Sequence, residues 1–189
     1  MKIQDVLYYA PNFKLAYLAT ATSSDIVNAF ESRISEYYFK AAEILNNQKS
    51  AFGAGDICFD AIDAIARFEF GSGGVGERFK KWISRLPDFK ALPRNEIEGV
   101  YDDFRNGITH EARIKNGGQF SYEIGRSIYV ENGIIVINPS LLLNQIRHEF
   151  ARFMEDVKSD SYATERLANS IRHDFREDLE MLERNAVAS

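Results

Sequence analysis

Cysteine is nearly absent from this chain of 189 residues, which contains only Cys58. An internal disulfide is therefore impossible. A thiolate zinc site is excluded as well, because such sites need several cysteine or histidine ligands at set spacings. The low cysteine content fits a reducing compartment. From these residue types we expect neither a bound metal nor a cofactor.

Long hydrophobic runs are also missing, and no stretch is long enough to cross a bilayer. The small residues at 19–21 imitate the cleavage site of a secretory signal. A signal needs a continuous apolar stretch before that site, and here Pro11, Asn12 and Lys14 interrupt it. We therefore expect a cytoplasmic protein that does not contact a membrane.

Positive charge is in deficit, with 23 lysines and arginines against 28 acidic residues and a net charge of -5. This balance excludes a protein coated in positive charge for non-specific binding of nucleic acid, although a local basic groove is still possible. Apolar residues make up 45% and aromatic residues 13% of the chain. That content is enough for a core and argues against disorder. The length suits one domain, 1–189.

Hydrophobic periodicity predicts a mainly α fold, a helical bundle with a small inserted β-hairpin. The helix expected over 56–70 is apolar almost all round, as is typical of a central helix in a bundle, and Gly71 ends it. We read residues 1–22 as an N-terminal arm, 119–137 as the hairpin and 138–183 as a C-terminal helix pair. The other helices are expected over 25–47, 75–86 and 94–116, with the final pair divided near residue 160.

Two turn signals support this order. Asn132-Gly133 lies between two β-rich runs, which is the strongest short signal for a hairpin. Asn138 precedes Pro139, the pattern of a cap followed by proline at the first helical position.

The segment 71–76 matches the pattern G-x-G-x-x-G of dinucleotide-binding proteins. That site needs a preceding strand and a βαβ unit, whereas here a helix precedes the glycines. We interpret the segment as a turn between helices. A second reading is a phosphate site, because the next helix carries Arg78, Lys80 and Lys81 near its start.

An acidic stripe follows one face of the 56–70 helix, where Asp56, Asp60, Asp63 and Arg67 stand three to four residues apart. The favoured interpretation is a surface pair of Asp63 with Arg67. The alternative is that the stripe faces the later helix that carries Arg105 and helps to orient it.

That later helix carries Arg105, Asn106 and His110. On a helical wheel Asn106 and His110 share a face that points away from the apolar stripe, and Arg105 lies on the flank. Gly107 costs roughly 1 kcal/mol against alanine inside a helix. It is useful where another backbone approaches closely or where the helix is about to end. The spacing alone is explained equally well if Arg105, Asn106 and His110 are solvated side chains on a helix surface without a function.

The run Phe104-Arg-Asn-Gly-Ile-Thr-His110 resembles the signature of the HEPN superfamily, in which an arginine and a polar residue precede a histidine late in a bundle helix. The apolar helix upstream, at 61–68, is similar too. The motif covers about ten residues, and the helical order extends the likeness over most of the chain. The resemblance implies a ribonuclease without metal, in which two protomers bring their motifs to one cleft. Toxin–antitoxin, phage-defence and RNA-processing systems use such proteins, and some members are inactive.

The resemblance implies roles for three residues: His110 moves a proton, Arg105 stabilises charge on the phosphate, and Asn106 orients the substrate or His110. The expected partners are RNA, a second protomer, and an antitoxin or regulatory protein. Ala112 stands where some toxins of the superfamily carry a tyrosine that a partner enzyme modifies. Three hypotheses follow: a homodimeric endoribonuclease, a silent HEPN-like binding module, and a helical scaffold without a site.

Overall fold

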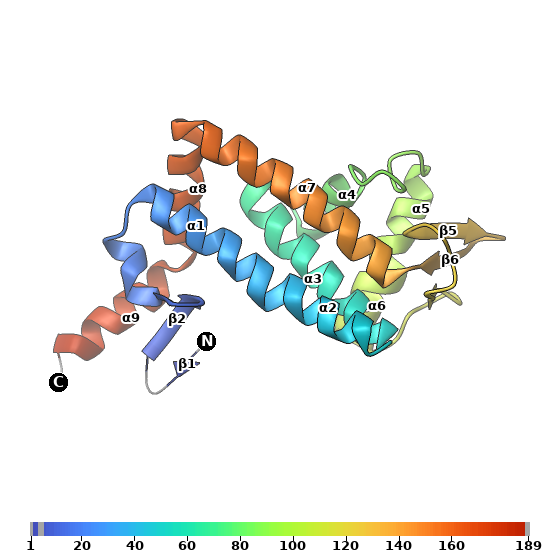
Figure 1. The fold of residues 1–189 in the computed structure, drawn as a ribbon, viewed down its shortest axis with the longest axis horizontal. Helices are drawn as coiled ribbons and strands as arrows, with labels where there is room; N and C mark the ends of the chain where they lie inside the picture. Colours follow the sequence, from blue (N-terminus) through green and yellow to red (C-terminus); the bar gives the residue numbers. More distant parts are fainter. Residues whose placement is uncertain (1, 4–5, 188–189) are drawn as a thin grey trace. The chain divides into compact units, whose positions relative to one another are not determined.

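The computed structural model describes residues 2–3 and 6–187, and it confirms a mainly α fold with little sheet (Figure 1). The chain forms two compact units. Residues 37–151 form the central unit, and the terminal unit combines 1–36 with 152–189. Within the described part of the chain, no helix has the length and hydropathy needed to cross a membrane.

The central unit is built around α3 (Ala51–Phe70). This helix contacts α2, α4, β4 and the motif helix, which is the helical run that carries Arg105, Asn106 and His110. Its buried side chains lie on several faces and include Phe59, Ile62 and Ile65, as expected for a central helix. Gly71 ends α3 at a φ of 67°. The other helices of this unit are α2 (Lys40–Asn47), α4 (Val75–Ile83), α5 (Arg94–Gly99), α6 (Gly107–Glu111) and the first part of α7 (Pro139–Ser159).

A three-stranded sheet in the central unit contains the predicted hairpin. Strands β5 (Ile128–Glu131) and β6 (Ile134–Ile137) pair antiparallel around Asn132 and Gly133, whose φ angles are 52° and 79°. Positive φ at both positions is what a tight hairpin turn requires. A third short strand within the predicted segment 119–137, β4 (Gln119–Phe120), pairs parallel with β6. Asn138 caps α7 as predicted, since its Oδ1 accepts from the backbone N–H groups of Ser140 and Leu141.

An aromatic cluster fills the core between α3, β4 and the motif helix. The ring of Phe59 lies 5.8 Å from that of Phe79 and 6.1 Å from that of Phe104. Phe104 in turn lies 5.3 Å from Phe120. Cys58 is fully buried beside this cluster on α3, and its burial raises the pKa of the thiol to about 12.

The terminal unit contains α1 (Ser23–Ile34), α8 (Ser161–Asp174) and α9 (Arg176–Val187), together with the end of α7. The predicted arm is structured here as the strands β1 (Lys2–Ile3), β2 (Val6–Ala10) and β3 (Phe13–Lys14) and a 3₁₀ turn, η1 (Leu15–Ala19). Arg172 of α8 donates to the carbonyls of Leu18 and Ala21, at 3.0 and 2.9 Å. The arm is thus packed against α8; its residues 1, 4 and 5 lie outside the described residues.

The helix expected over 25–47 is present as a continuous helical run from Ser23 to Asn47, in which a π-helical segment, η2 (Ser35–Phe39), lies between α1 and α2. Two other predicted boundaries were wrong. The helix expected to reach residue 116 ends at Glu111, because Ala112 adopts the left-handed conformation with a φ of 53°. The C-terminal pair is three helices, since the expected last helix is divided between α8 and α9 at Phe175. The Phe175 ring packs edge-on against Tyr9 at 5.2 Å.

Candidate functional site

The motif residues lie on one helical run, made of α5, the π-helix η3 (Val100–Asn106) and α6. Its apolar side chains, among them Phe104 and Ile108, are buried against the central unit. Arg105 and Asn106 are half-buried and His110 is exposed. The predicted division between a buried stripe and an outward polar face is therefore present.

The π-helix changes how the polar residues face one another. An ideal α-helix turns by 100° per residue, whereas a π-helix hydrogen-bonds from i to i+5 and turns by less. Arg105 lies near the end of η3, directly before α6. From the flank, where a regular α-helical wheel places it, the long side chain of Arg105 reaches His110.

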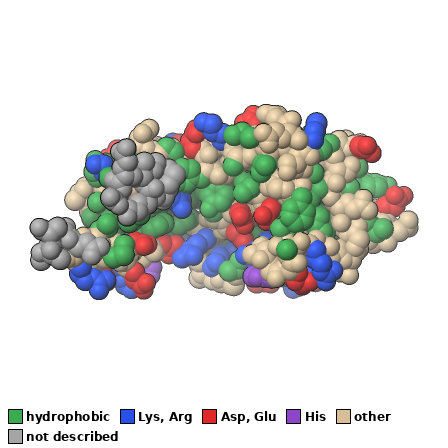
Figure 2. All heavy atoms as spheres, turned by 90° about the horizontal axis from the view of Figure 1, so that it is seen from below, with side chains coloured by type: hydrophobic (Ala, Val, Ile, Leu, Met, Phe, Trp, Pro, Cys, Tyr) green, Lys and Arg blue, Asp and Glu red, His purple; other side chains and the backbone are tan. Residues whose placement is uncertain are grey.

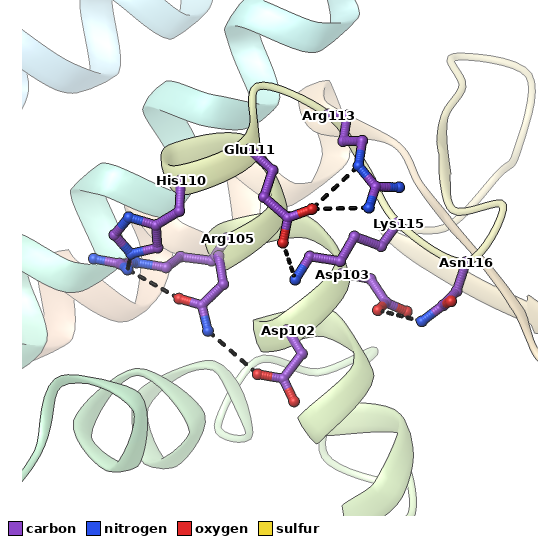
Figure 3. A network of polar contacts seen from close by, with 9 residues as sticks. Asp102, Asp103, Arg105, His110, Glu111, Arg113, Lys115 and Asn116 are labelled. Carbon is purple, nitrogen blue, oxygen red and sulfur yellow. Dashed lines mark hydrogen bonds and ion pairs between the residues drawn. The ribbon is translucent and has the colours of Figure 1, made fainter.

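Arg105 makes polar contacts with three other side chains, and Figure 3 shows it beside His110. Its Nε donates to Asp63 Oδ2 at 2.6 Å and its Nη1 donates to Asn106 Oδ1 at 3.0 Å. The same Nη1 lies 3.4 Å from His110 Nε2. Because a guanidinium can only donate, a hydrogen bond forms here when Nε2 of His110 accepts, in the tautomer that carries its proton on Nδ1.

Asn106 holds Arg105 rather than His110. Its Oδ1 accepts from Arg105, and its Nδ2 donates to Asp102 Oδ1 at 3.2 Å. The structure thus brings all three predicted residues together, with Arg105 between the other two. The amide of Asn106 therefore links the guanidinium of Arg105 to the carboxylate of Asp102.

Asp63 is the site residue that the favoured sequence interpretation missed. It pairs with Arg105, 42 residues later in the chain, and both side chains are 17% exposed. Burial raises the pKa of Asp63 and outweighs the opposing effect of Arg105. Among the described atoms, Asp63 Oδ1 has no hydrogen-bond partner. The alternative noted for the acidic stripe, that it faces the Arg105 helix, holds for this residue.

Gly107 makes possible the turn that closes the site. A Cβ atom at this position would lie 2.5 Å from the carbonyl oxygen of Arg113, so no side chain fits there. Both reasons suggested for this glycine apply, because a backbone approaches it closely and the helix ends four residues later. The returning chain brings Lys115 and Arg113 to Glu111, with ion pairs of 2.7 and 2.8 Å.

The three motif residues, together with Glu111 and Lys115, border an open pocket of about 630 Å³. The pocket takes its polar groups from the motif helix and the following turn, and Val75 and Tyr101 add apolar surface. The visible face of the molecule mixes basic, acidic and apolar side chains and has no uniform basic coat (Figure 2). This agrees with the negative net charge. The pocket is lined by Val75, Tyr101, Arg105, Asn106, His110, Glu111 and Lys115.

The glycine-rich segment is a turn between α3 and α4, as interpreted. Arg78 donates to the carbonyls of Gly71 and Gly73, at 3.1 and 2.6 Å, and so closes the turn on itself. Gly76 is required for packing and not for the turn, because a Cβ there would lie 2.8 Å from the ring of Tyr101. The absence of a side chain at Gly76 lets Tyr101 lie against α4 at the edge of the pocket.

Asp60 has an unusual pKa. Although its side chain is exposed, the protein around the carboxyl group removes part of its solvent, and the nearby Asp56 and Asp63 add negative charge. These effects together raise the pKa of Asp60 from 3.8 to about 6, against the opposing influence of Arg105.

We expect Asp60→Asn to stabilise the protein at pH 7.5 but not at pH 4. The folded state binds this proton more tightly than the unfolded chain, so its contribution to stability is fully present below pH 3.8 and is lost as the pH rises through about 6. After allowance for solvent screening, the gain at pH 7.5 is about 1 kcal/mol. Urea unfolding at both pH values measures it, with Asp156→Asn at an exposed position of α7 as the control. An equal difference at both pH values would contradict the assignment.

Metal-ligating side chains do not gather in the described part of the chain, where no three histidine, cysteine, aspartate or glutamate residues are placed to hold one ion. In comparisons with known proteins, no family model matches the chain, and neither curated proteins nor solved structures give a match.

Proposed function

We propose that this chain is a metal-independent endoribonuclease of the HEPN type, which acts as a homodimer. The observation that carries the proposal is the contact of Arg105 with His110, 3.4 Å apart, at the border of an open pocket. A guanidinium beside an imidazole supplies the two functions that RNA cleavage needs, which are charge stabilisation at phosphorus and proton transfer.

In the proposed reaction, Nε2 of His110 takes the proton of a ribose 2′-hydroxyl, and the 2′-oxygen attacks the adjacent phosphorus. The P–O5′ bond breaks, giving a 2′,3′-cyclic phosphate and a 5′-hydroxyl end. Arg105 stabilises the charge that develops on the phosphoryl oxygens, a task suited to its fork of donors. Asp63 and Asn106 hold the guanidinium in place from two sides.

The leaving 5′-oxygen also needs a proton, and the described pocket contains one histidine. A second protomer related by a two-fold axis would supply the other. Two features favour such pairing: His110 is exposed, and Val75, an apolar side chain that is 43% exposed, lies at the same pocket. A cytoplasmic toxin or phage-defence effector, restrained by an antitoxin or regulatory protein, is the setting we propose.

One observation favours a second candidate, a catalytically silent HEPN-like module that binds a protein or nucleotide partner. Arg105 is already neutralised by Asp63 at 2.6 Å, and Asp102 lies next to it through Asn106. An arginine held in this way has less charge to offer to a phosphate. The two candidates differ in whether RNA is cut.

The deciding experiment is cleavage of a mixed RNA substrate by the purified protein in excess EDTA. We expect wild-type protein to cut RNA and leave cyclic phosphate ends. Arg105→Ala should lower the rate by about 10²–10³-fold, the cost of removing a group that stabilises charge in a transition state. Arg113→Ala, which removes an arginine that is 63% exposed from the turn after the motif helix, is the matched control and should change the rate less than about threefold.

Two results would overturn this proposal. No cleavage by a folded wild-type protein would favour the binding module. Cleavage that persists in Arg105→Ala would place the activity at a different site or in another protein of the preparation.

A further inference from the structure

A second hollow of about 390 Å³ lies between α4 and α5, within the central unit. Three cations border it, Lys80, Lys81 and Arg94, against the single carboxylate of Glu77. Leu92 and Ile97 add apolar surface. We call this hollow the basic groove. An excess of positive charge here is notable because the whole chain carries a net charge of -5.

The cations of the groove are available to an anion. Arg94 is 85% exposed and pairs with Glu98 at 2.9 Å. Lys80 is 20% exposed and pairs at 2.7 Å with Glu77, which is itself 72% exposed. Exposed pairs of this kind contribute little stability, so a polyanion can replace the carboxylates at small cost. Lys81 lies 4.1 Å from the centre of the Phe70 ring, and the described residues include no acidic partner for it.

Tyr101 joins the groove to the motif pocket. Lys80 borders the groove and lies 6.0 Å from the centre of the Tyr101 ring. Arg105 lies 5.8 Å from the same ring, and Tyr101 itself borders the motif pocket. One cation from each hollow therefore lies within about 6 Å of the same ring.

An aromatic ring placed between cations along a groove is the arrangement by which proteins hold single-stranded nucleic acid, with bases on the rings and phosphates on the cations. A duplex cannot present its stacked bases to such a ring. The path runs from His110 and Arg105 past Tyr101 to Lys80, Lys81 and Arg94.

We propose that the basic groove binds the phosphates of single-stranded RNA next to the bond that is cut, with Tyr101 contacting a base between groove and pocket. This inference rests on the proposed ribonuclease function, because it treats the motif pocket as the place of cleavage. It adds to that function the substrate class and the direction in which the strand leaves the pocket.

The test is binding of a 2′-O-methyl oligouridine of about ten nucleotides, which cannot be cut through a 2′-hydroxyl, measured over a range of salt concentrations. The variant is Lys81→Ala with Arg94→Ala. The matched control is Lys14→Ala with Arg176→Ala in the terminal unit, which also removes one lysine beside an aromatic ring and one arginine from an i, i+4 ion pair. Circular dichroism establishes that both double variants are folded.

Each phosphate contact on a single strand contributes about 0.7 to the slope of log affinity against log salt, so two lost contacts lower that slope by about 1.4. Between 1 M and 0.1 M salt this difference amounts to a roughly 25-fold loss of affinity. We expect this loss in the groove variant and affinity within about twofold of wild type in the control.

Equal affinity and equal slope in the groove variant and the control would overturn the inference, as would a wild-type protein that does not bind the probe at low salt. Stronger binding of a duplex of equal length would overturn the assignment to single strands. The two proposals fail separately. If Arg105-dependent cleavage is found but the groove variant binds as wild type, only the groove is wrong. If the groove variant alone loses affinity and the wild type cuts no RNA, the ribonuclease function is wrong, and the groove binds single-stranded RNA but not beside a bond that this protein cuts.

Discussion

His110→Ala is expected to lower the rate of RNA cleavage by about 10²–10⁴-fold, the range that a positioned general base or acid contributes. The proposed reaction needs a proton acceptor at the 2′-hydroxyl, and His110 Nε2 is held as an acceptor beside Arg105. Alanine removes that acceptor but leaves the ion pair of Arg105 with Asp63 intact. The measurement is single-turnover cleavage in EDTA.

The matched control for this prediction is His148→Ala. His148 is also an exposed helical histidine, and its Nδ1 lies 2.7 Å from the carbonyl oxygen of Asn144. We expect its variant to cut RNA at the wild-type rate. If both histidine variants cut RNA normally, the proton transfer assigned to His110 is wrong.

Mixing wild-type protein with the His110→Ala variant tests whether a second protomer supplies part of the site. With a roughly ninefold excess of His110→Ala protein, most wild-type protomers pair with a variant protomer, and a cleft that needs two histidines loses its activity. The activity per wild-type protomer should then fall to about a tenth. An unchanged activity would mean that each protomer cuts RNA alone, and a strictly monomeric protein would contradict the dimer directly.

Gly55→Ala should destabilise the central unit by about 2 kcal/mol, which is the cost of overpacking a filled core less the gain in helix propensity. A Cβ on Gly55 would lie 2.1 Å from Cζ of Phe120. The ring has little room to yield inward, because Phe59 and Phe104 surround it at 6.1 and 5.3 Å. It must move outward, and the aromatic cluster beneath the motif helix loses a member.

Gly53→Ala on the same helix is the control for Gly55→Ala. Its nearest neighbours, Leu45 and Ser50, would lie 3.4 Å from the new Cβ, an ordinary contact. We expect a gain of about 0.5–1 kcal/mol, since alanine is the better helix former. Fluorescence of Trp82, the only tryptophan and a buried residue of α4, follows unfolding of the central unit alone. A Gly55 variant as stable as the Gly53 variant would contradict the prediction.

The sequence was sufficient to predict features that depend on local chemistry. Three features of this kind follow from a few neighbouring residues, and the structure contains each of them. They are the apolar side chains on most faces of α3, the Asn132-Gly133 turn and the Asn138 cap. The grouping of Arg105, Asn106 and His110 was predictable for the same reason, because they lie within six residues on one helical run.

The features that the sequence did not reveal depend on tertiary contacts. A wheel of 100° per residue cannot represent η3, where packing of Val100 and Phe104 into the core accompanies a wider helical turn. The pair of Asp63 with Arg105 joins two helices, whereas spacing alone favours a partner on the same helix. The early end of α6 requires a left-handed alanine, Ala112, which no propensity predicts.

The buried thiol of Cys58 is a probe of local unfolding around α3. Burial raises the pKa of this thiol to about 12, so little of it is ionised near neutral pH, and only the thiolate reacts with alkylating reagents. The sulfur is also fully enclosed, and it lies 3.8 Å from the carbonyl oxygen of Pro139. Alkylation of the native protein must therefore wait for α3 to separate from its neighbours. The labelling rate reports how often the helix that carries Asp63 comes away from the core.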